Sequence, residues 1–312
     1  MLRTILLPAL AGCALALSGC GDKPQAAAGD NASKAVPAFV AEENAWRAQR
    51  DANLRKPDGW TSLVGLHWIE LKAHYVGSSA DSGIRLAKGP PRMGLLQQEG
   101  EHLFFTPEKG VAITIDGQPL DKRVELHDDM SESPSVVGFD DGKGQMTVIA
   151  RDGRHALRVK HADADTRTRF AGLQYWPADP SWKIDAKFVP NAPGKTIQVA
   201  DIIGAVNEEP NPGAVEFQRD GRTWRIEALD EGDGSLFLVF ADRTNGHGSY
   251  GAGRFLYADK PGPDGKVVLD FNQAYNPPCA FTPFATCPLP PPENRLDLAV
   301  TAGEQKYAGG SH

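Results

Sequence analysis

Val111-Ala112-Ile113-Thr114-Ile115-Asp116-Gly117 combines the two signals that decide the fold class of this chain. Large apolar residues alternate with smaller or polar ones, as in a strand with one buried face, and Asp-Gly is a typical dipeptide of a tight hairpin turn. Both signals recur along the chain. Further alternating runs span 156–160, 223–227 and 266–270, and further Asp-Gly pairs occupy 141–142, 152–153, 220–221 and 264–265.

Two other segments complete the expected architecture. Residues 235–240 (SLFLVF) are more continuously apolar and predict a central strand, whereas residues 38–56 predict one amphipathic helix that ends before Pro57. The sequence therefore predicts an all-β fold of two β-sandwich or barrel-like units preceded by one N-terminal helix. A polar stretch over 161–168 places the boundary between the units, 38–165 and 166–312, near residue 165.

The N-terminal residues carry the features of an export signal. Arg3 gives a positive start, and an apolar run and small residues follow it. Leu17-Ser18-Gly19-Cys20 resembles a bacterial lipobox, in which cleavage precedes the cysteine and the thiol then receives a diacylglycerol. We expect a signal peptide over 1–19, lipidation at Cys20 and a flexible tether over 20–37, a stretch of small and polar residues.

Membrane attachment is expected to depend on the lipid alone, because the apolar run is shorter than the about 20 residues that cross a bilayer as a helix. Gly21 follows the cysteine where Asp favours inner-membrane retention in many Gram-negative bacteria, so we expect the outer membrane and a periplasm-facing domain. Cleavage leaves 32 basic against 40 acidic residues, a net charge of −8. Nucleic acid is therefore not an expected partner.

Cys279 and Cys287 remain after cleavage, eight residues apart. In an oxidising compartment a disulfide between them would close a short loop and contribute roughly 2–3 kcal/mol to stability. The alternative is a pair of free buried thiols. A metal site is the weakest interpretation, because two ligands without a nearby His or Cys do not make a zinc set.

Two long motifs, 59–68 (GWTSLVGLHW) and 270–296 (DFNQAYNPPCAFTPFATCPLPPPENRL), together with 170–177 and 250–254, resemble the DUF1684 family of unknown function. The resemblance covers residues 40–308 and implies no particular activity. The first half also resembles a forkhead-associated (FHA) β-sandwich over 75–77, 84–86 and 115–120. Because Ser78 and Pro91 stand where that domain carries its phosphate-binding groups, we expect a scaffold and not a phosphopeptide reader.

The motif at 270–296 predicts an ordered irregular segment, because its prolines cannot donate to a β ladder. Its aromatic and amide side chains suit a small-molecule pocket, and a rigid cap on a sheet edge is the alternative. Arginines could clamp a carboxylate or phosphate there unless acids neutralise them. The candidate ligand-binding residues are Arg158, Arg169, Asp242, Tyr250, Arg254, Asn272, Tyr275, Asn276 and Asn294.

Gly246-His-Gly-Ser-Tyr-Gly251 matches the dinucleotide pattern G-x-G-x-x-G, but a strand-like run follows where a helix is required, so we expect a hairpin. No cofactor and no metal are expected. The function predicted from the sequence is a membrane-anchored lipoprotein that binds a small, possibly anionic, molecule or supports the cell envelope. The alternatives are a hydrolase with its site near 242–254 and 271–294, and a structural interaction domain.

Overall fold

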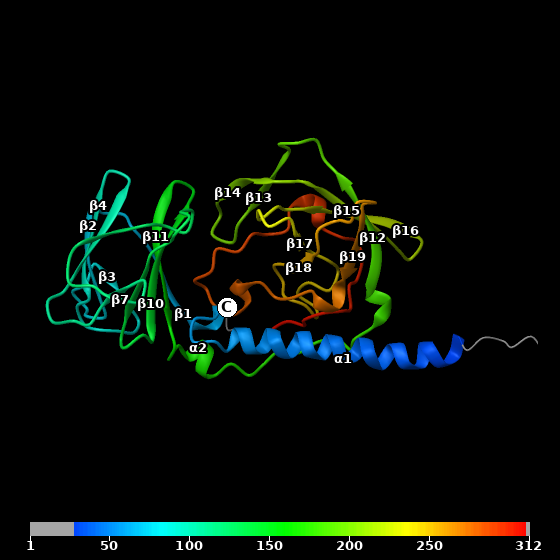
Figure 1. Cartoon of the computed structure of the whole chain (residues 1–312), viewed down its shortest axis with the longest axis horizontal. Coiled ribbons are helices and arrows are strands. Elements are labelled where there is room, and N and C mark those ends of the chain that lie inside the picture. Colours follow the sequence, from blue (N-terminus) through cyan, green and yellow to red (C-terminus); the bar gives the residue numbers. More distant parts are fainter. Residues whose placement is uncertain (1–27, 310–312) are drawn as a thin grey trace, which may run out of the picture.

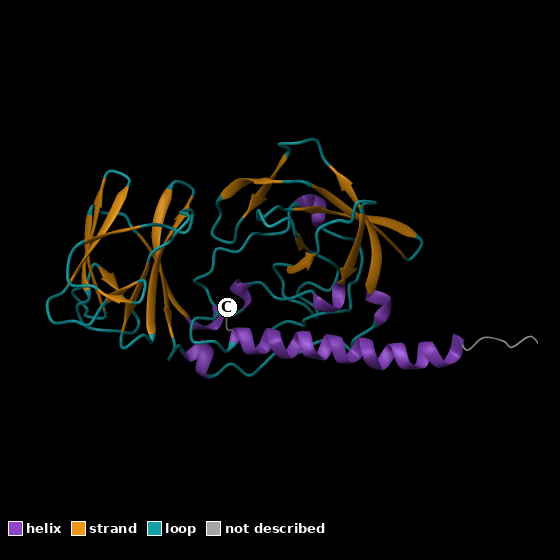
Figure 2. Cartoon of the chain, in the orientation of Figure 1, coloured by secondary structure: helices purple, strands orange, loops and turns teal. Residues whose placement is uncertain are grey.

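The computed structural model describes residues 28–309 and consists mainly of β-sheet, with one long helix at its N-terminal end (Figures 1 and 2). The predicted all-β fold with a single N-terminal helix is confirmed. Two β units stand side by side, and helix α1 (Ala28–Leu54) runs along the C-terminal unit to the junction between them (Figure 1). The predicted signal peptide and Cys20 lie outside the described residues.

Helix α1 begins ten residues before the helix expected from the sequence, so residues 28–37 are helical where a flexible tether was expected. This stretch contains three alanines and a lysine, which are strong helix formers, and these offset Pro37 inside the helix. At the other end of the helix Leu54 is buried. No helix among residues 28–309 has the length and apolar content that a membrane span requires.

The N-terminal unit is built from two sheets that enclose one apolar core. Leu96, Phe105, Met146 and Val159 point into this core from both sheets and are at most 1% exposed. One sheet contains, in spatial order, β1 (Leu63–Trp68), β11 (Arg154–His161), β10 (Gly144–Arg151), β9 (Val136–Phe139), β6 (Thr114–Ile115) and β7 (Gln118–Pro119). The other contains β3 (Ile84–Arg85), β2 (Ala73–Gly77), β4 (Gly94–Glu99), β5 (His102–Pro107) and β8 (Val124–Leu126).

Most of the predicted hairpin turns are present. At 116–117, 141–142, 152–153 and 220–221 both the Asp and the Gly have positive φ, the conformation that the shortest hairpins need. At 264–265 only Gly265 does, because Asp264 instead accepts a hydrogen bond from the Lys266 N–H. The run at 111–115 supplies only the two residues of β6, since the Val111 N–H is taken up in a turn with the Glu108 carbonyl.

The C-terminal unit divides its strands among smaller sheets. All five residues of β17 (Leu236–Phe240) are buried, as their apolar run suggests, but β17 belongs to a two-stranded sheet and is not the predicted central strand. It pairs with β18 (Arg254–Ala258), and β13 (Thr196–Ala200) pairs with β14 (Val206–Pro210). The largest sheet contains, in order, β16 (Arg222–Ala228), β15 (Gly213–Arg219), β12 (Lys183–Pro190) and β19 (Lys266–Asp270). Short helical turns are η1 (Trp60–Ser62), α2 (Asp165–Thr168) and η2 (Pro180–Trp182).

After β19 the described chain forms no further strand and runs as the irregular segment that its prolines predicted. It contains three turns of 3₁₀ helix, η3 (Phe271–Gln273), η4 (Pro278–Ala280) and η5 (Pro292–Asn294). Its backbone forms hydrogen bonds with strands whose edges would otherwise lack a partner. Tyr275 exchanges two hydrogen bonds of 2.9 Å with Phe255 of β18, and the Leu289 N–H donates to the carbonyl of Ala200 in β13. The segment therefore covers the edges of both hairpins.

Candidate ligand-binding cleft

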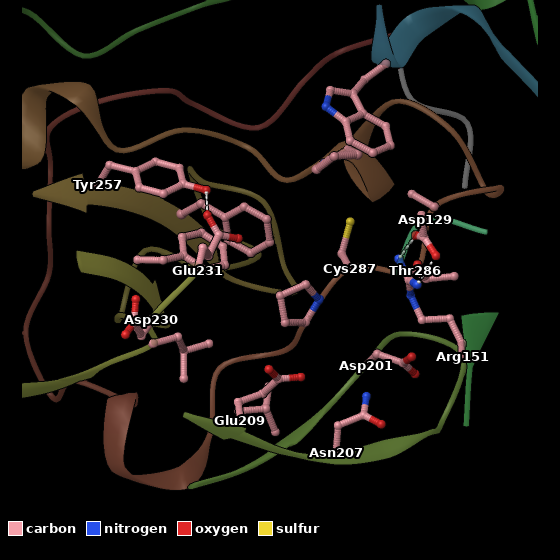
Figure 3. A pocket seen from close by; sticks show the side chains of 18 of the residues that line it. Asp129, Arg151, Asp201, Asn207, Glu209, Asp230, Glu231, Tyr257, Thr286 and Cys287 are labelled. Atoms are coloured by element: carbon pink, nitrogen blue, oxygen red, sulfur yellow. Dashed lines mark hydrogen bonds and ion pairs between the residues drawn. The ribbon is translucent and has the colours of Figure 1, made fainter. Parts of the chain in front are cut away.

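A cleft of about 1090 Å³ lies where the two β units and α1 meet (Figure 3). Each of these parts contributes a wall, and the irregular segment contributes residues 285–288 between them. Ligand pockets are typically about 300–1,000 Å³ and combine apolar surface with a few polar groups. The cleft has that size and that mixed character, so it is the candidate site of the molecule.

The wall from the N-terminal unit contains Arg151, Arg158 and Trp60. Arg151, at the end of β10, is neutralised by Asp129 at 2.8 Å. Arg158, on the adjacent β11, forms no ion pair with any carboxylate of the described residues. Its one side-chain partner is the hydroxyl of Thr286, which accepts a hydrogen bond from Nη2 at 3.3 Å.

The Arg158 guanidinium is half-buried, and its Nε hydrogen is buried without an acceptor. Burial lowers the pKa of Arg158 from its ordinary value, and the neighbouring Arg151 lowers it further. The ring of Trp60 lies 5.6 Å away and offers a cation–π contact in place of a carboxylate. A partly desolvated arginine without a carboxylate partner among the described residues can still donate hydrogen bonds to an anionic group.

The wall from the C-terminal unit combines aromatic rings with carboxylates. Phe237 of β17 and Tyr257 of β18 are cross-strand neighbours with stacked rings 4.9 Å apart. Tyr257 is 44% exposed and donates its hydroxyl hydrogen to Glu231. Asp201, Asn207, Glu209 and Asp230 also line this side (Figure 3).

Cys279 and Cys287 are free thiols in the structure, both buried, instead of the disulfide that their spacing favoured. The Cys279 N–H donates to the Cys287 sulfur at 3.2 Å, so the pair is held together by a hydrogen bond. The side-chain hydrogen bond with the Cys279 thiol and burial raise the pKa of the Cys287 thiol, whereas the bond from the Cys279 N–H lowers it. Cys287 lines the cleft beside Thr286.

Arg254 and Asp242 do not face the cleft, which corrects the prediction that they bind a ligand. Arg254 is 0% exposed, and its Nη2 lies 2.8 Å from an Asp242 oxygen whose side chain is also fully buried. The same guanidinium donates to the carbonyls of Val300 and Ala302. The acid thus neutralises the arginine, and the pair ties the C-terminal residues to the hairpin β17–β18.

The three candidate asparagines are also buried and engaged with the backbone. Asn272 bonds to both the N–H and the carbonyl of Asp179. Asn294 accepts from the Glu227 N–H and donates to the carbonyls of Glu227 and Val239. Asn276 donates to the carbonyl of Gln305, and its Oδ1 is buried without a partner. None of the three lines the cleft, because the irregular segment uses their amides as substitutes for ladder bonds.

The remaining candidates have separate positions. Tyr250 donates its hydroxyl to the Cys279 carbonyl, and burial raises its pKa. Arg169 is exposed and pairs with Asp165 at 3.4 Å. Of the predicted residues, Arg158 and Tyr275 line the cleft, together with Cys287. The irregular segment contacts the glycine turn 246–251 through the bond between Tyr250 and Cys279.

The structure does not assemble the proposed hydrolase site. The Asp242 carboxylate is occupied by Arg254 and by the N–H groups of Thr244 and Val300, which leaves it no free oxygen to orient a base. His247 makes no side-chain hydrogen bond to either Asp242 or Tyr250. Within residues 28–309, no three His, Cys, Asp or Glu side chains are placed to hold a metal ion.

Sequence reasoning missed most residues of the cleft. Trp60 and Arg151 come from the N-terminal unit, and Arg50 comes from α1, far from the C-terminal motif in sequence. The one available signal was the pairing of acids at 208–209 and at 230–231, each at the end of a strand. That pattern alone does not distinguish a site from a solvated loop.

The fold and the cleft define a protein of two β units with a ligand-sized cleft between them. Residues 168–305 match the family model described as "Protein of unknown function (DUF1684)", which supports the predicted family for this part of the chain. The motif at 59–68, within the predicted extent of 40–308, lies outside the match. A solution NMR structure of an uncharacterized protein from Haloarcula marismortui is 32% identical over 46% of this chain and 80% of that chain, with a TM-score of 0.38. No curated protein matches the chain.

Proposed function

We propose that the protein binds a small molecule carrying a carboxylate or phosphate in the cleft between its two β units. Arg158 carries this proposal, because it is a half-buried arginine in the cleft wall that has no carboxylate partner among the described residues. Every other candidate arginine that the sequence suggested is neutralised, Arg254 by Asp242 and Arg169 by Asp165. An anionic group at Arg158 would receive the charge-assisted hydrogen bonds that the protein itself does not supply.

Thermal unfolding of the full chain with inorganic phosphate, succinate and neutral glycerol tests this proposal. A ligand at 100 times its Kd stabilises a folded protein by about 2.7 kcal/mol, which is a shift of several degrees. We expect an anion, and not glycerol, to raise the melting temperature of the wild type, and Arg158→Gln to abolish the shift.

Arg169→Gln is the matched control, because it removes an exposed arginine outside the cleft and should leave the shift intact. Retention of the shift in Arg158→Gln, or no stabilisation by any anion, would contradict the proposal.

We further propose that the protein is a lipoprotein of the bacterial envelope, anchored through Cys20 with its β units facing the periplasm. The lipobox at 17–20 supports this, as does Gly21 for outer-membrane location. Metabolic labelling with a palmitate analogue should mark the wild type and not Cys20→Ser. Label retained in the variant excludes this anchor, and fractionation of the labelled protein distinguishes the two membranes.

For the N-terminal unit we propose an FHA-like scaffold that does not read phosphopeptides. The two-sheet sandwich supports the resemblance to the FHA fold. Ser78 supports the absence of phosphopeptide binding, since its hydroxyl donates a hydrogen bond to the Gly89 carbonyl at 2.8 Å. Titration with a phosphothreonine peptide should therefore leave the amide signals of residues 77–79 unchanged. A saturable shift there would contradict this assignment.

A further inference from the structure

The two ends of the cleft differ in chemistry. Arg151, Asp129 and Thr286 lie at one side in Figure 3, whereas Tyr257, Glu231 and Asp230 lie at the other. The first end holds the cationic Arg158 bonded to Thr286. At the second end Arg50 is paired with Glu304, and the lining acids have no Lys or Arg partner among the described residues, so a ligand that spans the cleft meets charges of opposite sign at its two ends.

The aromatic side of the second end is a row of rings. Tyr257 stacks on Phe237 at 4.9 Å and lies nearly parallel to Tyr275 at 6.3 Å, with 13° between the last two planes. Arg50 of α1 already places its guanidinium 4.5 Å from the centre of the Tyr275 ring. Tyr257 lies between the other two rings, so its faces are turned toward them, but its side chain is still 44% exposed.

Carboxylates complete this end. Glu209, Asp230 and Glu231 line the cleft, and none forms an ion pair with a Lys or Arg among residues 28–309. Glu231 accepts the hydroxyl hydrogen of Tyr257, which fixes it beside the ring. An ammonium group in this position would donate hydrogen bonds to the Glu231 carboxylate and to the Tyr257 hydroxyl oxygen, a charge-assisted combination that suits an amine.

We propose that the ligand is a linear zwitterion, such as a short peptide with free ends, whose carboxylate lies at Arg158 and whose ammonium lies between Tyr257 and Glu231. This inference rests on the proposed function, since it assigns the second end of the same cleft. Gln49, Asn53 and Asn207 line the cleft as well, and their amides can pair with the peptide groups of such a chain. A cleft of about 1090 Å³ exceeds what a single small anion occupies.

Isothermal titration of the full chain with tri-, tetra- and penta-alanine tests the inference. Each peptide is compared with its N-acetylated form, which lacks the ammonium, and with its C-terminal amide, which lacks the carboxylate. We expect one free-ended length to bind best, and either modification to weaken it about tenfold or more.

Two variants assign each end. In Arg158→Gln the free peptide and its C-terminal amide should bind equally, because the residue that binds the carboxylate is gone. In Glu231→Gln the free and N-acetylated peptides should bind equally, because the residue that binds the ammonium is gone. Glu231→Gln keeps an acceptor for the Tyr257 hydroxyl. Glu101→Gln is the control, since that exposed carboxylate lies outside the cleft, and in this variant both modifications should still weaken binding.

The outcomes separate the two proposals. An acetylated peptide that binds as tightly as the free one overturns the zwitterion. If no peptide binds but phosphate or succinate stabilises the wild type through Arg158, the zwitterion is excluded and the anion site stands. If neither peptide nor anion binds to the folded protein, both proposals are excluded.

Discussion

The two β units of this protein differ in how their backbone N–H and carbonyl groups find hydrogen-bond partners. In the N-terminal unit, two continuous sheets satisfy the backbone and enclose one apolar core. In the C-terminal unit, the sheets are small, and a long irregular segment must find partners for its N–H and carbonyl groups one by one. Buried side chains supply them, including Arg254, Asn272 and Asn294. The asparagines of the family motif therefore hold the fold together and do not line the cleft.

The strongest test of this contrast is Arg254→Ala. Removing one partner of a buried ion pair leaves Asp242 charged and alone, which costs about 3–5 kcal/mol of stability. Urea unfolding should show this loss. Arg243→Ala is the control, because both side chains of its ion pair with Asp297 are exposed and such a pair contributes about 0–1 kcal/mol to stability. Equal losses in the two variants would mean that the buried pair has no special role.

Leu96→Ala tests the apolar side of the contrast. Leu96 is fully buried in the N-terminal core, so the cavity should cost about 3 kcal/mol. Hydrogen exchange should accelerate at the amides of β2, β4 and β5 while those of β17 and β18 stay protected. Faster exchange in both units would show that the two cores are one cooperative structure.

Asn294→Ala tests whether amides replace ladder bonds. Its side chain forms three hydrogen bonds with the backbone at Glu227 and Val239, and their loss should cost about 2 kcal/mol in urea unfolding. Asn53→Ala, an exposed change on α1, should cost much less. A small effect at Asn294 would indicate that water takes over these bonds.

The smallest expected effect concerns pH and the contact of α1 with the C-terminal unit. Burial, and then the nearby Asp270, raise the pKa of Glu43, which also faces Gln273 and Arg47. The folded protein thus keeps a proton on Glu43 at pH values where the unfolded chain has lost it. Its contribution to stability is full below about pH 4.5 and is lost as pH rises through the folded pKa.

Glu43→Gln cannot titrate, so the stability difference between wild type and variant should shift in favour of the variant over that pH range. Urea unfolding between pH 4 and 8 measures this difference. A difference that does not change with pH would contradict the raised pKa.

The sequence predicted the fold class because its signals are local. Alternating runs and Asp-Gly pairs report strands and turns without knowledge of distant contacts, and four of the five turns have both residues at positive φ. The predicted start of the N-terminal helix was wrong, because the small and polar residues before it suggested a flexible tether, although the alanines among them favour helix. The boundary near residue 165 stays a prediction.

The candidate site was less predictable because it is made from three separate parts of the chain. Arg158 and Tyr275 were identified by residue type, whereas Arg254 was assigned to a ligand because nothing in the sequence shows that Asp242 neutralises it. Whether an arginine is free or paired depends on tertiary contacts. The same holds for Arg151, which faces the cleft but is neutralised by Asp129.

Helix α1 also has a mechanical consequence. Two arginines on the helix and one directly after it attach it to the C-terminal unit. Arg47 donates to the carbonyl of Trp176, Arg50 bonds to Glu304 and to the carbonyl of Asn276, and Arg55, which follows the helix, donates to the carbonyl of Phe170. The helix therefore transmits a force applied at the N-terminal end of the described chain to the C-terminal unit. Because Arg50 is also part of the cleft wall, a shift of the helix along its axis would break the bond to Glu304 and change the shape of the candidate cleft at the same time.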